Sequence, residues 1–136
     1  MKWIGLAGLA ATATLAAPAV ADEVWVTERG EAYYAEEIGG FAIFQVPWGE
    51  DVEATFYFEG LAGNYDHRGT HEGYWIFPSQ IEECPAVLVG VDNLASPEWG
   101  RVTLVFDEAS FPTGWTATVT TCFNDDPFAI RADLPN

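Results

Sequence analysis

The stretch DVEATFYFEG, Asp51–Gly60, alternates apolar and polar side chains at almost every position. Because successive side chains of a β-strand point to opposite faces, this alternation predicts a strand with one buried and one exposed face. The predicted buried set is Val52, Ala54, Phe56 and Phe58, and the predicted exposed set is Glu53, Thr55, Tyr57 and Glu59.

The same alternation recurs in RVTLVFD, residues 101–107, and in GWTATVTTCF, residues 114–123. No window has the helical spacing of apolar residues over three turns. Clusters of Gly, Pro, Asn and Asp separate the short apolar runs, which is typical of antiparallel folds. The sequence therefore predicts an all-β domain, a small antiparallel β-barrel or barrel-like sandwich of about eight or nine strands. Further strands are predicted at 24–27, 32–36, 41–47, 70–77, 86–91 and 128–132.

The first 21 residues, MKWIGLAGLAATATLAAPAVA, combine one lysine, an apolar run, Pro18 and a terminal Ala-Val-Ala triplet. This pattern is typical of a secretory signal peptide that is cleaved after Ala21. The apolar run is too short and too rich in alanine for a membrane span. We therefore expect a single domain, residues 22–136, that is periplasmic or secreted and carries no membrane anchor after cleavage.

The chain contains two cysteines, Cys84 and Cys122. In an exported protein two cysteines favour a disulfide, since the compartment is oxidising. Their spacing does not form the C-x-x-C pattern of metal or redox sites. We therefore predict one disulfide between Cys84 and Cys122.

Acidic residues dominate the charge. The full chain has a formal net charge of −16 from 21 acids and five basic residues, and removal of Lys2 with the leader leaves four arginines and −17. Such a surface repels phosphates, so nucleic acid is not an expected partner. The charge has two compatible interpretations. It keeps a protein soluble in saline surroundings, or it attracts a basic partner.

Both histidines lie in the stretch GNYDHRGTHEGYWIF, residues 63–77. Asp66, His67 and Arg68 are expected to form a solvated loop that pairs internally. His71 is expected on the inward face of the following strand, near the mouth of the barrel. The two histidines are four residues apart, about 13 Å along a strand, so no metal site or cofactor is predicted. The alternative is a turn at Gly69 that brings both histidines together with Asp66 or Glu72 around a metal ion. Strand parity places His71, Gly73, Trp75 and Phe77 inward, and Thr70, Glu72, Tyr74 and Ile76 outward.

Catalytic motifs are weak in this chain, because no serine lies in a G-x-S-x-G pattern and the thiols are expected to be oxidised. Asp92-Asn93 and Asn124-Asp125-Asp126 do not match the EF-hand spacing and are interpreted as turns. Glu53, Glu59 and Glu72 are the carboxylates considered for glycosidase chemistry, which depends on a separation that sequence does not show.

Three functions are compatible with these features. The favoured one is a non-catalytic, inhibitor-like β-scaffold that presents loops 60–69 and 92–100 to a basic protein. The alternatives are a barrel that binds a sugar or apolar ligand, and a metal- or carboxylate-dependent enzyme that uses residues 66–72. The candidate binding residues are Asp66, His67, Arg68, His71, Glu72, Trp75 and Trp99, and the interior lining proposed for a ligand is Phe56, Trp75, Phe77 and Trp115.

The charge imbalance predicts that salt stabilises the fold. Most of the 21 acids have no cationic partner, so their mutual repulsion opposes the compact state at low ionic strength. We expect the melting temperature to rise between about 10 mM and 1 M sodium chloride, as the Debye length falls from roughly 30 Å to 3 Å. Differential scanning calorimetry measures this. A melting temperature that is flat in salt would contradict the saline interpretation.

Overall fold

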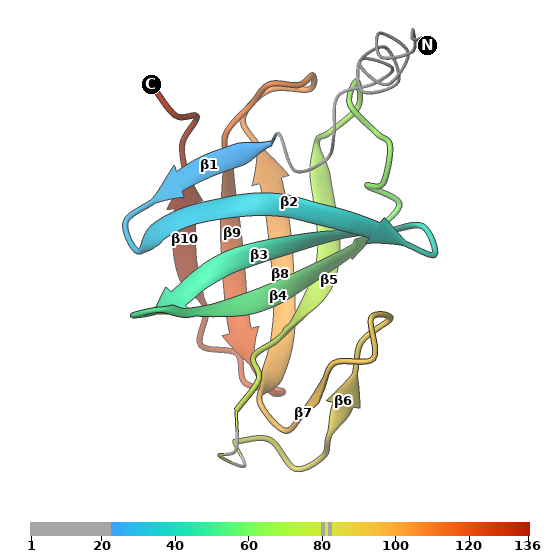
Figure 1. The fold of residues 1–136 in the computed structure, drawn as a ribbon, viewed down its shortest axis with the longest axis vertical. Helices are drawn as coiled ribbons and strands as arrows, with labels where there is room; N and C mark the ends of the chain where they lie inside the picture. Colours follow the sequence, from blue (N-terminus) through green and yellow to red (C-terminus); the bar gives the residue numbers. More distant parts are fainter. Residues whose placement is uncertain (1–22, 80, 82) are drawn as a thin grey trace, which may run out of the picture.

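The computed structural model describes residues 23–79, 81 and 83–136 (Figure 1), so the predicted signal peptide, residues 1–21, lies outside the described residues. This part of the chain is all β, as predicted, and it contains no helix that could cross a membrane. Its strands are β1 (Val24–Thr27), β2 (Gly30–Ile38), β3 (Phe41–Gly49), β4 (Val52–Glu59), β5 (Thr70–Ile76), β6 (Leu88–Val89), β7 (Ala95–Ser96), β8 (Trp99–Phe106), β9 (Trp115–Thr121) and β10 (Phe128–Ala132).

Eight strands form one antiparallel sheet in the order β1-β2-β3-β4-β5-β8-β9-β10. Strands β1 to β4 cross in front of β8 to β10, and β5 curves between the two groups (Figure 1). The first and last strands meet through a bridge between Val26 and Asp133, so the sheet is a nearly closed barrel. The predicted barrel is therefore confirmed. Strands β6 and β7 form a separate hairpin in the connection between β5 and β8.

Large aromatic side chains fill the barrel interior. Phe44 of β3 lies at their centre, with its ring centroid 5.1 Å from that of Trp25, 5.2 Å from Tyr34, 5.3 Å from Phe58 and 6.0 Å from Trp115. Small side chains face the same interior and leave space for these rings, which is how a small barrel is packed. The alanines of the interior are Ala32, Ala42, Ala54, Ala117 and Ala132.

Gly100 of β8 leaves space for the indole of Trp75 to pack directly against the backbone. A Cβ atom at this position would lie 1.8 Å from the carbonyl oxygen of Thr120 and 2.6 Å from Nε1 of Trp75. The indole of Trp75, which is paired with Gly100 in the sheet, instead donates a hydrogen bond of 2.8 Å to that carbonyl. Glycine is therefore needed here for close approach, not for an unusual backbone angle.

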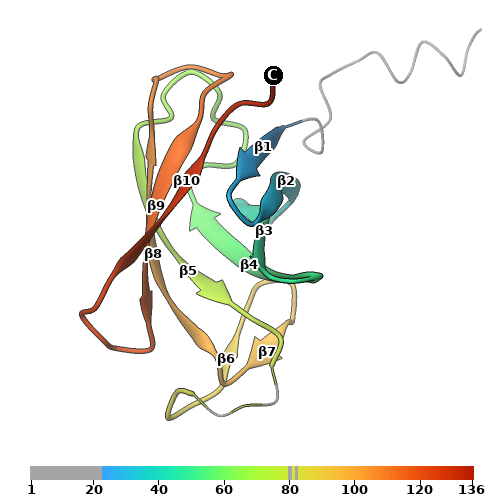
Figure 2. The same cartoon turned by 90° about the vertical axis from the view of Figure 1, so that its left-hand side faces the viewer.

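The described residues of the β5–β8 connection, 77–79, 81 and 83–98, lie at the lower end of the barrel in Figure 2 and cover part of its outer face. Beneath it lies a second apolar cluster that includes Ile43, Tyr57, Ile76 and Trp99. The hydroxyl of Tyr57 donates a hydrogen bond of 2.8 Å to Asp92 of the connection. Burial, followed by the hydrogen bond to Asp92 and then the negative charge of its carboxylate, raises the pKa of Tyr57 above its usual range. The phenol therefore stays protonated and keeps donating.

The predicted exposure of β4 is partly wrong. Ala54, Phe56 and Phe58 are buried in the interior as expected, and Glu53 and Glu59 are exposed. Tyr57 and Thr55 face outward but are buried, because the β5–β8 connection and neighbouring side chains cover them. Val52 is 43% exposed, since it begins the strand at the end of the barrel.

The predicted disulfide joins Cys84 and Cys122. Cys84 lies in the β5–β8 connection and Cys122 directly follows β9, so the bond ties the connection to the barrel. The amide of Cys84 also donates to the carbonyl of Pro97, and that of Cys122 to the carbonyl of Trp99. Of the strand predicted at 86–91 only the short β6 forms, and β7 is a further short strand within the predicted loop 92–100.

Because both faces of β4 are covered, truncation on either face should destabilise the protein. We expect Phe56→Ala and Tyr57→Ala each to lower the free energy of unfolding by about 3–5 kcal/mol. Glu53→Ala, at an exposed position of the same strand, should change it by about 0.5 kcal/mol or less. Urea denaturation measures all three. A small loss for Tyr57→Ala would mean that the connection does not cover this face in solution.

Candidate functional site

The loop that carries the first histidine is closed by Asn64. Its side-chain amide donates to the carbonyl of His67 at 2.9 Å, and the amide of His67 donates back to Oδ1 of Asn64 at 3.0 Å. Asp66 and His67 are both exposed. The prediction of a solvated loop is therefore confirmed for these two residues.

For Arg68 the prediction of a solvated position is wrong, because its side chain is only 1% exposed. Its guanidinium makes a two-pronged ion pair with Glu23, at 2.7 and 2.8 Å, and Nε donates to the carbonyl of Asn64 at 3.0 Å. Glu23 lies 45 residues away in the sequence, so no local signal indicates the pair. The rings of Tyr65, Phe106 and Phe111 surround the guanidinium at 4.9–5.6 Å.

His71 and Glu72 lie on opposite faces of β5. His71 is paired with the interior residue Leu104 and its ring lies edge-on to Phe106 at 6.3 Å, so the inward prediction is confirmed. Glu72 is exposed on the outer face. Within the described parts of the chain no group of three His, Cys, Asp or Glu side chains could hold a metal ion. Residues 66–72 therefore do not converge on one point.

The two predicted binding tryptophans are buried. Trp75 lies in the barrel interior, and Trp99 lies beneath the β5–β8 connection, where its indole donates to the carbonyl of Ala86 at 2.8 Å. The loops predicted to present a binding surface, 60–69 and 92–100, lie at opposite ends of the barrel (Figure 1). They do not form one continuous surface.

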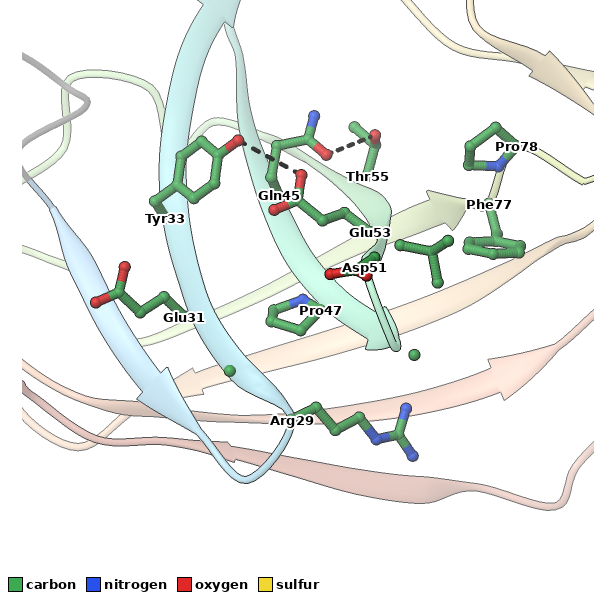
Figure 3. A pocket seen from close by; sticks show the side chains of 13 residues that line it. Arg29, Glu31, Tyr33, Gln45, Pro47, Asp51, Glu53, Thr55, Phe77 and Pro78 are labelled. Carbon is green, nitrogen blue, oxygen red and sulfur yellow. Dashed lines mark hydrogen bonds between the residues drawn. The ribbon is translucent and has the colours of Figure 1, made fainter.

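An open groove of about 820 Å³ runs over the outer face of β2, β3 and β4, beside the start of the β5–β8 connection (Figure 3). Three outward side chains, Tyr33, Gln45 and Thr55, are neighbours across the three strands. We call this site the outer groove. It is lined by Arg29, Gly30, Glu31, Tyr33, Gln45, Pro47, Gly49, Asp51, Val52, Glu53, Thr55, Phe77 and Pro78.

Polar contacts order the floor of the outer groove. Tyr33 donates to Oε1 of Glu53 at 3.4 Å, and Thr55 donates to Oε1 of Gln45 at 3.3 Å (Figure 3). Partial burial, followed by the charge of Glu53, raises the pKa of Tyr33, so this phenol is a hydrogen-bond donor at neutral pH. The floor can both donate to and accept from a polar ligand.

The charged lining of the outer groove is acidic, with three carboxylates, Glu31, Asp51 and Glu53, and one guanidinium, Arg29. The guanidinium lies 5.9 Å from the ring of Trp48 and 5.8 Å from that of Phe128. The guanidinium of Arg29 therefore already has cation–π contacts with aromatic rings at the end of the barrel. The three carboxylates are all exposed and create a negative potential where a ligand would enter.

Local sequence explains why the groove opens here. The β3–β4 pairing shifts register between Pro47 and Gly49, and Asp51 turns the chain with a φ of 60°. Such irregularities bend a strand pair away from its neighbours. Sequence reasoning placed Glu53 and Thr55 on the outer face and predicted strands at 32–36 and 41–47, but it had no signal that these strands lie beside β4 and complete the groove.

Comparison of the chain with protein families, with curated proteins and with solved structures finds no match. The function must therefore be inferred from the geometry and charge of the molecule itself.

The buried ion pair predicts unequal roles for two arginines. Arg68→Met leaves the carboxylate of Glu23 buried without a partner, so it should lower the free energy of unfolding by about 3–5 kcal/mol. Arg131→Met removes an exposed pair with Asp107 and should cost about 1 kcal/mol or less.

The double variant Glu23→Leu/Arg68→Met should recover much of the loss, since apolar groups can replace a buried pair. Guanidinium denaturation of the four proteins provides the comparison. Similar losses for the two single variants would argue against a buried pair.

Proposed function

We propose that this protein is an exported, non-catalytic binding protein that recognises a cationic segment of a partner protein through the outer groove. The observation that carries the proposal is the groove itself, which is open, has a polar floor and holds three carboxylates against one arginine. A cationic side chain entering it would meet acceptors on several sides, and charge-assisted hydrogen bonds are the stronger ones.

The charge of the whole chain supports the same partner. Two of the four arginines of the predicted mature chain already have carboxylate partners, Arg68 with Glu23 and Arg131 with Asp107 and Asp133. Few cations are thus left to offset the 21 acids. A field of this sign accelerates encounter with a basic protein and repels acidic ones.

The disulfide supports the location of that partner. The bond between Cys84 and Cys122 is consistent with an oxidising compartment, because cytosolic thiols are kept reduced. Together with the leader-like segment 1–21, it favours a periplasmic or secreted protein.

The two alternative functions have less structural support. Of the interior positions considered for a small ligand, Phe56, Trp75 and Trp115 are buried in the aromatic core. Phe77 is only partly buried against that core and also lines the outer groove. The enzyme hypothesis requires Asp66, His67, His71 and Glu72 to meet around a cleft, whereas they occupy an exposed loop and two opposite faces of β5.

The test uses a fluorescent nona-arginine peptide and three proteins: the parent, a groove variant and a control. The groove variant carries Glu31→Gln, Asp51→Asn and Glu53→Gln. The control carries Glu59→Gln, Glu72→Gln and Glu108→Gln, which remove the same charge from exposed positions outside the groove. We expect the groove variant to raise Kd at least about tenfold, which corresponds to about 1.4 kcal/mol, and the control to raise it less than about threefold.

Salt provides the second comparison, because binding driven by charge must weaken as ions screen it. Fluorescence anisotropy at about 20 mM and 500 mM sodium chloride measures Kd in both conditions. Equal losses in the two triple variants would show that the peptide senses only net charge, not the groove. Absence of binding at low salt would overturn the proposed function.

A further inference from the structure

The barrel closes through a single residue pair. Val26 of β1 and Asp133, just after β10, exchange two backbone hydrogen bonds of 2.8 and 2.9 Å. Among the described residues no other bridge joins the two ends of the sheet. Figure 2 shows β1 close to β10 near the upper end of β10, and no described strand pairs with the rest of this edge.

Strand β1 does not continue alongside β10, because it turns sharply into β2. Thr27 is paired with Gly30 at the hairpin end, and its hydroxyl donates to the carbonyl of Gly30 at 2.8 Å. The amide of Arg29 in turn donates to that hydroxyl. The chain therefore reverses between Thr27 and Gly30 and does not continue alongside β10.

The geometry of β10 determines which backbone groups are left free. Both backbone groups of Asp133 point toward β1. Because alternate residues of a strand direct their N–H and C=O groups to the same edge, those of Arg131 and Ala129 point toward the seam as well. Phe128, Ile130 and Ala132 direct theirs to β9, with which β10 pairs in unbroken register.

A groove lies where these free groups point. Its volume is about 460 Å³, and we call it the barrel seam. Its lining includes Ala129, Arg131 and Asp133, the three residues whose backbone groups point away from β9. The lining is Val26, Thr27, Glu28, Ala129, Arg131 and Asp133.

The side chains of the free edge do not block it. Ala129 is small and exposed. The Arg131 guanidinium extends toward β9 and the end of β8, where it donates to Thr116 at 3.3 Å and to Asp107 at 2.7 Å. Its Nε also donates to Asp133 at 3.0 Å. The strand has neither the bulge nor the internal proline or lysine with which edges are commonly protected. Its free hydrogen-bonding groups are thus accessible to another chain.

We propose that the barrel seam binds an extended, cationic segment of a partner protein as an additional β-strand against β10. Main-chain bonds to Ala129 and Arg131 would provide the pairing, as in other cases of β-strand addition. Glu28 and Asp133 at the seam, with Asp125 and Asp126 just before β10, favour basic side chains. The same acidic charge opposes a second copy of this chain. The expected charge of the segment rests on the proposed function.

Amide hydrogen exchange followed by NMR tests the pairing directly. The probe is the peptide acetyl-RVRVRVR-amide, added to the purified parent protein. In the free protein the amides of Ala129 and Arg131 should exchange fast, while those of Ile130 and Ala132, bonded to β9, are protected. With the peptide, protection of Ala129 and Arg131 should rise at least about tenfold. A control peptide of the same sequence with every backbone nitrogen N-methylated keeps the charge but cannot pair as a strand on either edge, and it should give no such protection.

A matched pair of variants tests the same edge. Ala129→Pro removes the N–H that points to the seam, which an edge strand tolerates, and should weaken peptide binding at least about tenfold. Ala129→Val keeps this N–H and should bind within about threefold of the parent. If the proline variant does not fold, the exchange measurement on the parent protein still shows whether the peptide pairs with β10.

Four outcomes separate this proposal from the outer groove and from self-association. Protection of Ala129 and Arg131 that persists in the Glu31→Gln/Asp51→Asn/Glu53→Gln variant supports the seam even if the groove fails. Peptide binding without this protection overturns the seam and leaves the groove standing. Equal protection by the N-methylated peptide also overturns strand addition. Protection that appears with protein concentration alone assigns the edge to a second copy and overturns the proposed partner.

Discussion

The packed aromatic interior is the constraint on which the rest of this structure depends. Phe44 contacts Trp25, Tyr34, Phe58 and Trp115, and five alanines face the same space. Interiors at this density do not admit a ligand without displacing side chains. A ligand or partner would therefore meet the outside of the barrel, where the sheet is covered only in part.

The β5–β8 connection decides which part is covered. It is held to the barrel by the bond between Cys84 and Cys122 and by the hydrogen bond from Tyr57 to Asp92. Apolar residues of the outer face, such as Ile43 and Ile76, lie under it. The polar residues Tyr33, Gln45 and Thr55 of the same face lie next to it and form the floor of the outer groove. The β5–β8 connection thus buries the apolar part of the outer face and lies beside the polar part.

The outer groove and the barrel seam lie on either side of the same hairpin turn. Arg29, Gly30 and Glu31 line the groove, whereas Val26, Thr27 and Glu28 line the seam. The two sites offer different chemistry, since the groove presents side chains and the seam presents backbone groups. Both have acidic surroundings, because the basic residues nearby are engaged. Arg131 lowers the pKa of Asp107 by hydrogen bonding to its carboxylate, and Arg29 lies over aromatic rings.

The sequence by itself determined the fold class, the disulfide and several strands. The strands predicted at 24–27 and 128–132 have the same bounds as β1 and β10, because alternation and turn residues are local signals. The interior faces of Ala54, Phe56, Phe58 and Trp75 follow from the same periodicity. Cys84 and Cys122 could be paired because the chain contains no other cysteine.

Only the tertiary structure decided the burial of Arg68, the cover over Tyr57 and the sites on the surface. The partner of Arg68 is 45 residues away and that of Tyr57 is 35 residues away, and neither distance leaves a periodic pattern. A polar or charged side chain is predicted to be exposed unless its distant partner is known. The outer groove joins three strands, and the barrel seam joins the first and last strands of the sheet. Both exist only because the sheet curves and closes, so that residues far apart in sequence become neighbours in space.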